Sequence, residues 1–193
     1  MRYLAWILTG TLLAGCVHSI EDDVTIASAP TEDDDYLGQL EKATKNRSVF
    51  KDFEKRYEVT ATYFSPEFRK ALNDRSRRVF LRELDPLKQG SGQATFMVSI
   101  YAPSDEKIEF DNEAHWTIQL DTGSAQSIRP LKVDRIQDKE HLRAFFSDVN
   151  EWTREYLLIF DVPAVNTDSP DLVEKTSMNL TFANADAKIS LSW

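Results

Sequence analysis

Apolar and polar residues alternate along several short stretches of this chain, and a period of two is typical of half-buried β-strands. In residues 57–64, for example, Tyr, Val and Ala side chains alternate with Glu and Thr. Residues 156–162 instead contain an unbroken apolar run, which is typical of a central strand buried on both faces. On these patterns we predict strands over residues 57–64, 93–101, 115–120, 128–136, 156–162, 179–182 and 188–193.

Helical patterns are found at two places in the chain. Residues 65–67, Ser-Pro-Glu, combine an N-cap serine, a proline suited to the first helical position and an early acidic residue. They predict a helix from residue 66 to about residue 84, which the Asp-Pro pair at 85–86 would end. Residues 142–152 have apolar residues at helical spacing and predict a short helix or a loop anchored by aromatic side chains.

Short strands separated by turns, with few strands followed by helices, define the predicted fold class. We expect a mainly β protein, an antiparallel β-sandwich of broadly immunoglobulin-like type with one helix on its N-terminal side. Residues 46–193 would form this domain, and about 150 residues are enough to bury one substantial core.

The beginning of the chain has the features of a bacterial export signal. Arg2 supplies a positive charge, and residues 3–12 are an apolar run too short to span a bilayer core of roughly 30 Å. The sequence Leu13-Ala14-Gly15-Cys16 follows at once. This motif resembles the lipobox of bacterial lipoproteins, in which the cysteine after the cleavage site is lipidated. We therefore expect a signal peptide over residues 1–15 and acylation of Cys16.

The lipoprotein resemblance implies how the mature chain is held and where. Several acyl chains on Cys16 would anchor it firmly in a membrane without a transmembrane helix. In diderm bacteria an aspartate after the lipidated cysteine favours the inner membrane, and here that position is Val17. We expect the outer membrane, with the domain facing the periplasm. The cell surface and the periplasmic face of the inner membrane are the alternatives, and a simple secretory signal with a chance cysteine is the competing interpretation of the motif.

A segment of different composition separates Cys16 from the predicted domain. Residues 17–35 hold seven acidic residues and no lysine, arginine or aromatic residue. Such a segment buries too little surface to offset the entropy of ordering it, and its charges repel an anionic lipid surface. We predict a disordered acidic tether over residues 16–45 that holds the domain off the membrane.

Charge limits the classes of partner. The formal net charge of −9 argues against nucleic acid. The expected partners are the membrane, through the acyl chains, and another envelope component. The chain has no glycine-rich phosphate loop and no cysteine besides Cys16, so we expect no cofactor, no metal and no disulfide.

Basic residues gather locally on the predicted helix and at its exit. Arginine forks bind phosphate and carboxylate groups, so this stretch could face an anionic partner such as lipopolysaccharide, a lipid headgroup or an acidic protein surface. The alternative is a solvated helix face with ion pairs inside the helix. The candidate residues are Arg69, Lys70, Arg75, Arg77, Arg78 and Arg82.

One short motif resembles the catalytic loop of aspartic proteases. Residues 120–124, Leu-Asp-Thr-Gly-Ser, follow an apolar strand as that loop does. Those proteases also need a second element, two apolar residues followed by glycine, and no glycine follows Gly123. We therefore predict an ordinary turn between Leu120 and Ile128 and assign no catalytic residue.

Two further residue groups could carry chemistry. Asp111, Glu113 and His115 would share one face of a continuous strand and could form a metal site, although carboxylates at the solvent side of a strand entrance are commoner. The second group is aromatic and could bind a sugar or an apolar partner, or could complete the core. Its members are Phe145, Phe146, Trp152 and Tyr156.

These observations favour a non-catalytic module that binds or scaffolds another envelope component. A lipoprotein that binds a lipid or a glycan in an aromatic cleft is the alternative. An envelope hydrolase is the third class, and the sequence offers no convincing nucleophile or acid and base pair for it.

Overall fold

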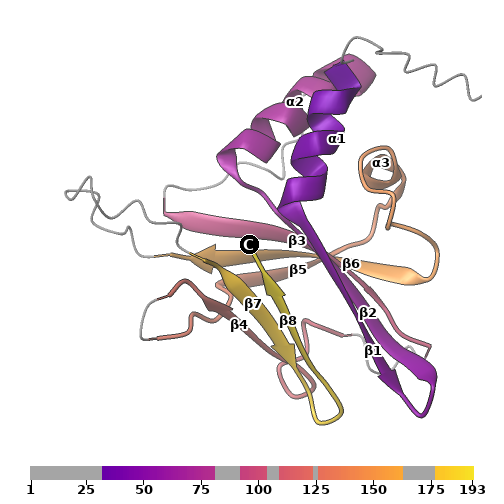
Figure 1. Ribbon diagram of the computed structural model, residues 1–193, viewed down its shortest axis with the longest axis vertical. Helices are drawn as coiled ribbons and strands as arrows, with labels where there is room; N and C mark the ends of the chain where they lie inside the picture. The colour runs from indigo at the N-terminus through magenta and orange to yellow at the C-terminus, as the bar shows by residue number, and fades with distance from the viewer. Residues whose placement is uncertain (1–31, 81–91, 104–108, 124–125, 163–176) are drawn as a thin grey trace, which may run out of the picture.

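The computed structural model describes residues 32–80, 92–103, 109–123, 126–162 and 177–193 (Figure 1). Over these ranges the chain is mainly β, with two antiparallel sheets and few helices. The elements in chain order are α1 (Glu32–Ala43), β1 (Thr44–Lys51), β2 (Glu54–Tyr63), α2 (Pro66–Phe80), β3 (Gln93–Tyr101), β4 (Thr117–Asp121), β5 (Lys132–Ile136), α3 (Glu140–Arg143), β6 (Thr153–Asp161), β7 (Asn179–Ala183) and β8 (Lys188–Ser192).

The larger sheet has five strands in the order β1-β2-β3-β6-β5, and the smaller has three in the order β4-β7-β8. All neighbouring strands in both sheets are antiparallel. The expectation of a mainly β, antiparallel fold is therefore confirmed.

The main hydrophobic core contains residues of both sheets. Alternate residues of β2, β3 and β6 point to this core because successive side chains of a strand face opposite sides of the sheet. Residues of β4, β7 and β8 complete it with the same period. Its fully buried members include Val59, Phe96, Val98, Ile100, Tyr156, Leu158, Phe160, Leu180, Phe182 and Ile189.

A second core lies between the helices and the opposite face of the five-stranded sheet. Helices α1 and α2 lie side by side above this sheet (Figure 1). The segment after α3 inserts two phenylalanines beside them. The buried residues of this second core are Tyr36, Ala43, Phe64, Phe68, Ala71, Leu72, Met97, Phe145, Phe146, Val149 and Leu157.

Helix α1 corrects the predicted tether over residues 16–45. Tyr36 is buried, its hydroxyl donates a 2.6 Å hydrogen bond to the carbonyl oxygen of Phe145, and its ring lies 6.0 Å from that of Phe68. Burial raises the pKa of Tyr36 well above its ordinary value. One aromatic side chain thus docks an acidic segment that composition alone assigned to the tether. The folded domain includes residues 32–45, and residues 16–31 lie outside the described residues.

Most predicted elements are found with small changes in their bounds. Strand β3 has the predicted bounds, and β6 lies between β3 and β5 with residues buried on both faces. Helix α2 begins at Pro66, and the Ser65 hydroxyl accepts a hydrogen bond from the Phe68 amide, so the predicted N-cap is confirmed. The predicted end of this helix near residue 84 lies outside the described residues.

Two strand predictions were incomplete. Strand β1 was not predicted at all, and it pairs with β2 around a turn at Asp52 and Phe53, both of which have positive φ. The predicted strand over residues 128–136 is shorter, because only residues 132–136 pair with β6. Ile128 instead forms an isolated bridge with Leu120.

Candidate functional site

The side of the five-stranded sheet that faces the helices changes from apolar to polar along its strands. Under the helices Met97 pairs with Leu157, and both belong to the second core. Two residues further along each strand, Ser99 lies opposite Thr60 on one side and Glu155 on the other. The sheet therefore continues past its helical cover with polar side chains on the same face.

This polar part of the sheet forms the floor of an open groove of about 510 Å³. Strands β1, β2, β3 and β6 supply the floor, and the loop before β6 supplies one wall. None of the lining side chains is aliphatic, apart from the hydrocarbon stem of a lysine. The lining residues are Asn46, Lys55, Glu58, Thr60, Ser99, Tyr101, Asp148, Asn150, Trp152 and Thr153. We call it the sheet groove.

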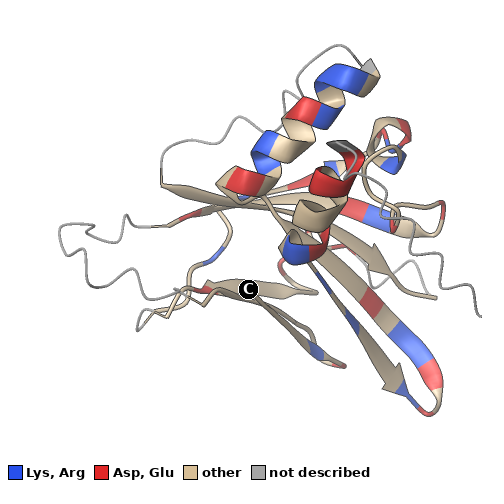
Figure 2. Cartoon of the chain, turned by 45° about the horizontal axis from the view of Figure 1, so that its top comes forward, with Lys and Arg blue, Asp and Glu red and all other residues tan. Residues whose placement is uncertain are grey.

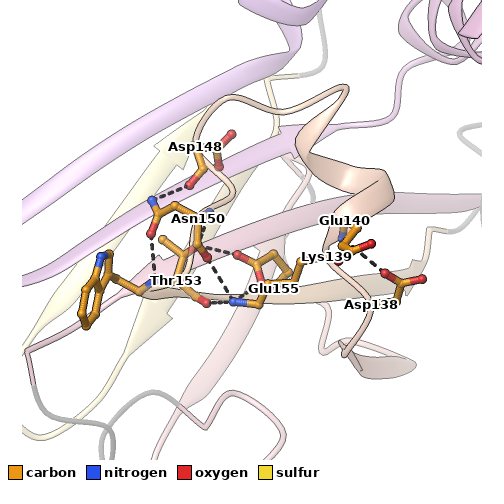
Figure 3. A network of polar contacts seen from close by, with 8 residues as sticks. Asp138, Lys139, Glu140, Asp148, Asn150, Thr153 and Glu155 are labelled. Carbon is orange, nitrogen blue, oxygen red and sulfur yellow. Dashed lines mark hydrogen bonds and ion pairs between the residues drawn. The ribbon is translucent and has the colours of Figure 1, made fainter.

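The wall loop is held by a dense set of hydrogen bonds (Figure 3). The Asn150 backbone N–H donates to the Thr153 hydroxyl at 3.0 Å, and the Asn150 side-chain oxygen accepts from the Trp152 backbone N–H at 2.9 Å. The Asn150 side-chain nitrogen donates to the carbonyl of Asp148 at 3.1 Å. Trp152 is thereby fixed at its backbone while its side chain is 75% exposed.

A buried ion pair supports this loop from beneath. Glu155 is 0% exposed, and its carboxylate lies 3.0 Å from the ammonium of Lys139 and accepts a 2.5 Å hydrogen bond from the Thr153 hydroxyl. The same ammonium donates to the backbone carbonyls of Asn150 and Thr153. A charge taken out of water needs such compensation. Because Lys139 contacts both Glu155 of β6 and the carbonyl of Asn150, it joins β6 to the loop.

The environments of two groove carboxyls shift their pKa values in opposite directions. Burial raises the pKa of Asp148, and the negative charge of Glu155 adds to this effect, although the Asp148 backbone and the Ser99 hydroxyl oppose it. A hydrogen bond from Lys55 is the main cause that lowers the pKa of Glu58. The ammonium of Lys55 lies 2.6 Å from the Glu58 carboxylate, so that this lysine is already paired within the groove.

The predicted anionic-partner surface is largely engaged within the molecule. Arg75 and Arg78 both lie near Asp33 of α1, at 3.7 and 3.6 Å, and the Arg75 guanidinium stacks 4.4 Å from the Tyr36 ring centre. Charges of both signs lie along the two helices (Figure 2). These arginines therefore fasten α1 to α2, through pairs between two helices and not the pairs inside one helix that the alternative described.

The other members of that set are scattered. Arg69 donates from Nε to the carbonyl of Phe64, and burial lowers its pKa. Lys70 is exposed, and Arg77 lies 3.6 Å from Asp74 on the same helix. Arg82 and the lipidation candidate Cys16 lie outside the described residues. The structure thus brings together only part of the predicted set, and it places that part against α1.

The protease-like motif forms a turn over its described residues. The Asp121 carboxylate accepts a 2.9 Å hydrogen bond from the Gly123 amide, and Gly123 has a φ of +78°. Asp121 is exposed on the last position of β4. Side-chain capping by an aspartate and positive φ at a glycine are ordinary turn chemistry, as predicted.

The continuous strand that a metal site at Asp111, Glu113 and His115 would require is not formed. Residues 110–115 make turns around Asn112, whose carbonyl accepts from the amides of His115 and Trp116. All three candidate side chains are exposed. Within the described ranges, no group of three or more His, Cys, Asp or Glu residues is arranged to hold a metal ion.

The aromatic group divides between the core and the surface. Phe145 and Phe146 complete the second core, and Tyr156 lies in the main core. Trp152 alone of the four lines the sheet groove. Sequence reasoning therefore named one residue of the groove as an aromatic candidate, but missed Ser99, Glu155 and Lys139. Ser99 stands between two apolar residues of β3, and Glu155 directly precedes the apolar run of β6, so neither gave a local signal of a groove.

Comparison with known proteins assigns the chain to no family. No family model matches the chain, and no curated protein matches its sequence. Among the helices of the described residues, none is both long and apolar enough to cross a membrane.

Proposed function

We propose that this chain is a membrane-anchored envelope lipoprotein whose folded domain is a non-catalytic binding or scaffolding module. The sheet groove carries the proposal. It is the place where the five-stranded sheet extends beyond its helical cover, with polar side chains on its floor and an exposed tryptophan in its wall. An ordered, concave and solvent-exposed surface of this kind is suited to holding a ligand or partner.

The anchor is proposed from the sequence motif. Leu13-Ala14-Gly15-Cys16 supports signal-peptide cleavage and acylation of Cys16, and Val17 supports placement in the outer membrane with the domain toward the periplasm. We further propose that the two-sheet arrangement is a sandwich of broadly immunoglobulin-like type, to which the helices α1 and α2 add an outer layer.

The anchor proposal predicts that Cys16→Ser abolishes lipidation. The serine variant lacks the thiol to which the first acyl group is attached, so metabolic labelling with a clickable fatty acid should mark only the unaltered protein. The variant should remain as precursor or leave the membrane fraction. Absence of label from the unaltered protein would contradict the lipoprotein assignment.

The groove proposal predicts that a copurifying envelope component depends on Trp152. After crosslinking of the acylated protein in membranes, Trp152→Ala should lose this component. Leu131→Ala removes another exposed apolar side chain, 66% exposed and outside the groove, and should retain it. Equal capture by both variants would exclude the groove as the binding surface.

Lipid or glycan binding is the second candidate function. Trp152 favours it, because an exposed aromatic ring beside hydrogen-bonding groups suits a ligand that is partly apolar and partly polar. An envelope hydrolase is the third class. It has weaker support, because the one protease-like aspartate, Asp121, is exposed and its carboxylate caps a turn.

A further inference from the structure

We infer that the ligand of the sheet groove is a carbohydrate, bound with one sugar face against Trp152. The inference rests on the proposed binding function and adds the chemical class of the ligand. It follows from three features of the groove: the hydrogen-bonding groups of its floor, the tryptophan of its wall, and the way its charges are paired.

The floor offers donors and acceptors side by side. Asn46 donates from its side-chain nitrogen to the Thr60 hydroxyl at 2.7 Å and to the Glu58 carboxylate at 3.4 Å, which leaves the amide oxygen for other partners. Ser99 lies in the next register position with its hydroxyl buried, whereas Tyr101 is partly exposed in the groove lining. A sugar hydroxyl both donates and accepts, so this mixture of hydroxyl and amide groups matches it better than a ligand of one polarity.

The wall offers a flat apolar surface that is already in place. The Trp152 side chain is 75% exposed, and its backbone N–H is held by Asn150. The axial C–H groups of a sugar ring form an apolar face that can lie on an aromatic ring. Because the ion pair of Lys139 with Glu155 holds the loop, little further backbone ordering accompanies binding.

The paired charges argue against other ligand classes. Lys55 is engaged by Glu58 and Lys139 by Glu155, so the groove carries no surplus of positive charge for a phosphate or sulfate. The lining side chains include no aliphatic residue that would hold an acyl chain. The volume of about 510 Å³ lies in the range of small-ligand sites, and the open form admits one or two sugars of a longer glycan.

The test uses the acylated protein in detergent micelles and measures saccharide binding by titration calorimetry. The probes are oligosaccharides of N-acetylglucosamine, of glucose and of mannose. We expect at least one series to bind in the micromolar to millimolar range. Trp152→Ala should weaken that binding by roughly tenfold or more, Trp152→Phe should keep most of it, and Leu131→Ala should leave it unchanged.

The outcomes distinguish failure of this inference from failure of the proposed binding function. If no saccharide binds, yet a Trp152-dependent component still copurifies, the ligand class is wrong and the binding module stands. If saccharides bind equally well to Trp152→Ala, whose melting temperature serves as the folding control, the assigned site is wrong. Cleavage of the bound saccharide would support the ligand class and contradict a non-catalytic module.

Discussion

The ion pair of Lys139 with Glu155 is the residue-level feature on which the groove depends most. Glu155 is fully buried, whereas the side chain of Lys139 is 24% exposed. Water reaches the ammonium in part, and the carboxylate has only protein partners near it. The two charges are therefore not equivalent, and loss of the lysine leaves the more costly one behind.

We predict that Lys139→Met lowers the free energy of unfolding by about 2–4 kcal/mol, because it leaves the Glu155 carboxylate buried without its cation. Urea denaturation measures this loss. Lys132→Met is the matched control, since Lys132 and Asp134 form an exposed pair and its loss should cost less than about 1 kcal/mol. Equal losses in the two variants would show that burial of Glu155 does not govern the effect.

Asp148 predicts a dependence of stability on pH. Its folded-state pKa is raised, chiefly by burial and then by the nearby Glu155, and the Tyr36 hydroxyl also lies within its electrostatic reach. The folded state therefore holds this proton more tightly than the unfolded state. The associated stability is present below the ordinary pKa near 4 and is lost as the pH rises through the raised value.

Asp148→Asn removes the titration and keeps a side-chain acceptor near Ser99. The melting temperature of this variant should match that of the unaltered protein near pH 3 and exceed it increasingly as the pH rises toward 7. Thermal melts across this range, with Asp121→Asn as an exposed control, test the sign. A melting temperature below that of the unaltered protein at pH 7 would mean that the Asp148 carboxylate stabilises the fold.

At the scale of elements, α1 is the described element that differs most from the prediction made from its sequence. It begins with four acidic residues, yet Tyr36 packs beneath it and Arg75 and Arg78 of α2 reach Asp33. Because the arginines of α2 carry the opposite charge, the acidic run takes part in a contact between the two helices and does not prevent folding. An isolated helix of 12 residues would be marginal, so this contact is what keeps it folded.

We predict that removal of residues 17–31 leaves the melting temperature almost unchanged, whereas removal of residues 17–43 lowers it by several degrees. The longer deletion removes Tyr36 and exposes the apolar surface around Phe68 and Phe145. Tyr36→Phe separates the hydrogen bond from the packing, with an expected loss of about 1–2 kcal/mol because the carbonyl of Phe145 loses its partner. Equal melting temperatures for both deletions would place α1 outside the cooperative unit.

Strands β3 and β6 could be predicted from the sequence because both are central and rich in apolar residues. Strand β1 escaped prediction because it is an edge strand with only Val49 and Phe50 as apolar residues. Its turn at Asp52 and Phe53 also lacks the Asn-Gly or Asp-Gly pair that usually marks two positions of positive φ.

The groove could not be predicted for a different reason. The polar cross-strand row consists of Asn46, Thr60 and Ser99, which line the groove, and Glu155, which is buried beneath it; each of these residues comes from a different strand. A row of this kind is defined by register, which depends on which strands pair and where. A local pattern shows which face a residue takes on its own strand, but not which residue lies opposite to it.

At the scale of the whole molecule, the sheet that forms the groove is also the middle layer of the domain. One face packs against the three-stranded sheet, and the other is divided between the helices and the groove. A ligand in the groove would therefore rest on strands whose opposite face belongs to the main hydrophobic core. Such a floor resists deformation because packed cores leave little free volume.

The contact between Trp193 and Ala43 also bears on the rate at which the chain folds. The indole N–H donates to the Ala43 carbonyl across 150 positions of the chain, and the indole also packs 5.1 Å from the Phe96 ring. Strand β4 likewise pairs along its length with β7, which lies far downstream in the chain. Chains dominated by such distant pairings fold in milliseconds to seconds and not in microseconds. Throughout that interval the aromatic strands of the unfinished core remain accessible, and it is then that a chaperone or a second copy of the chain could engage them.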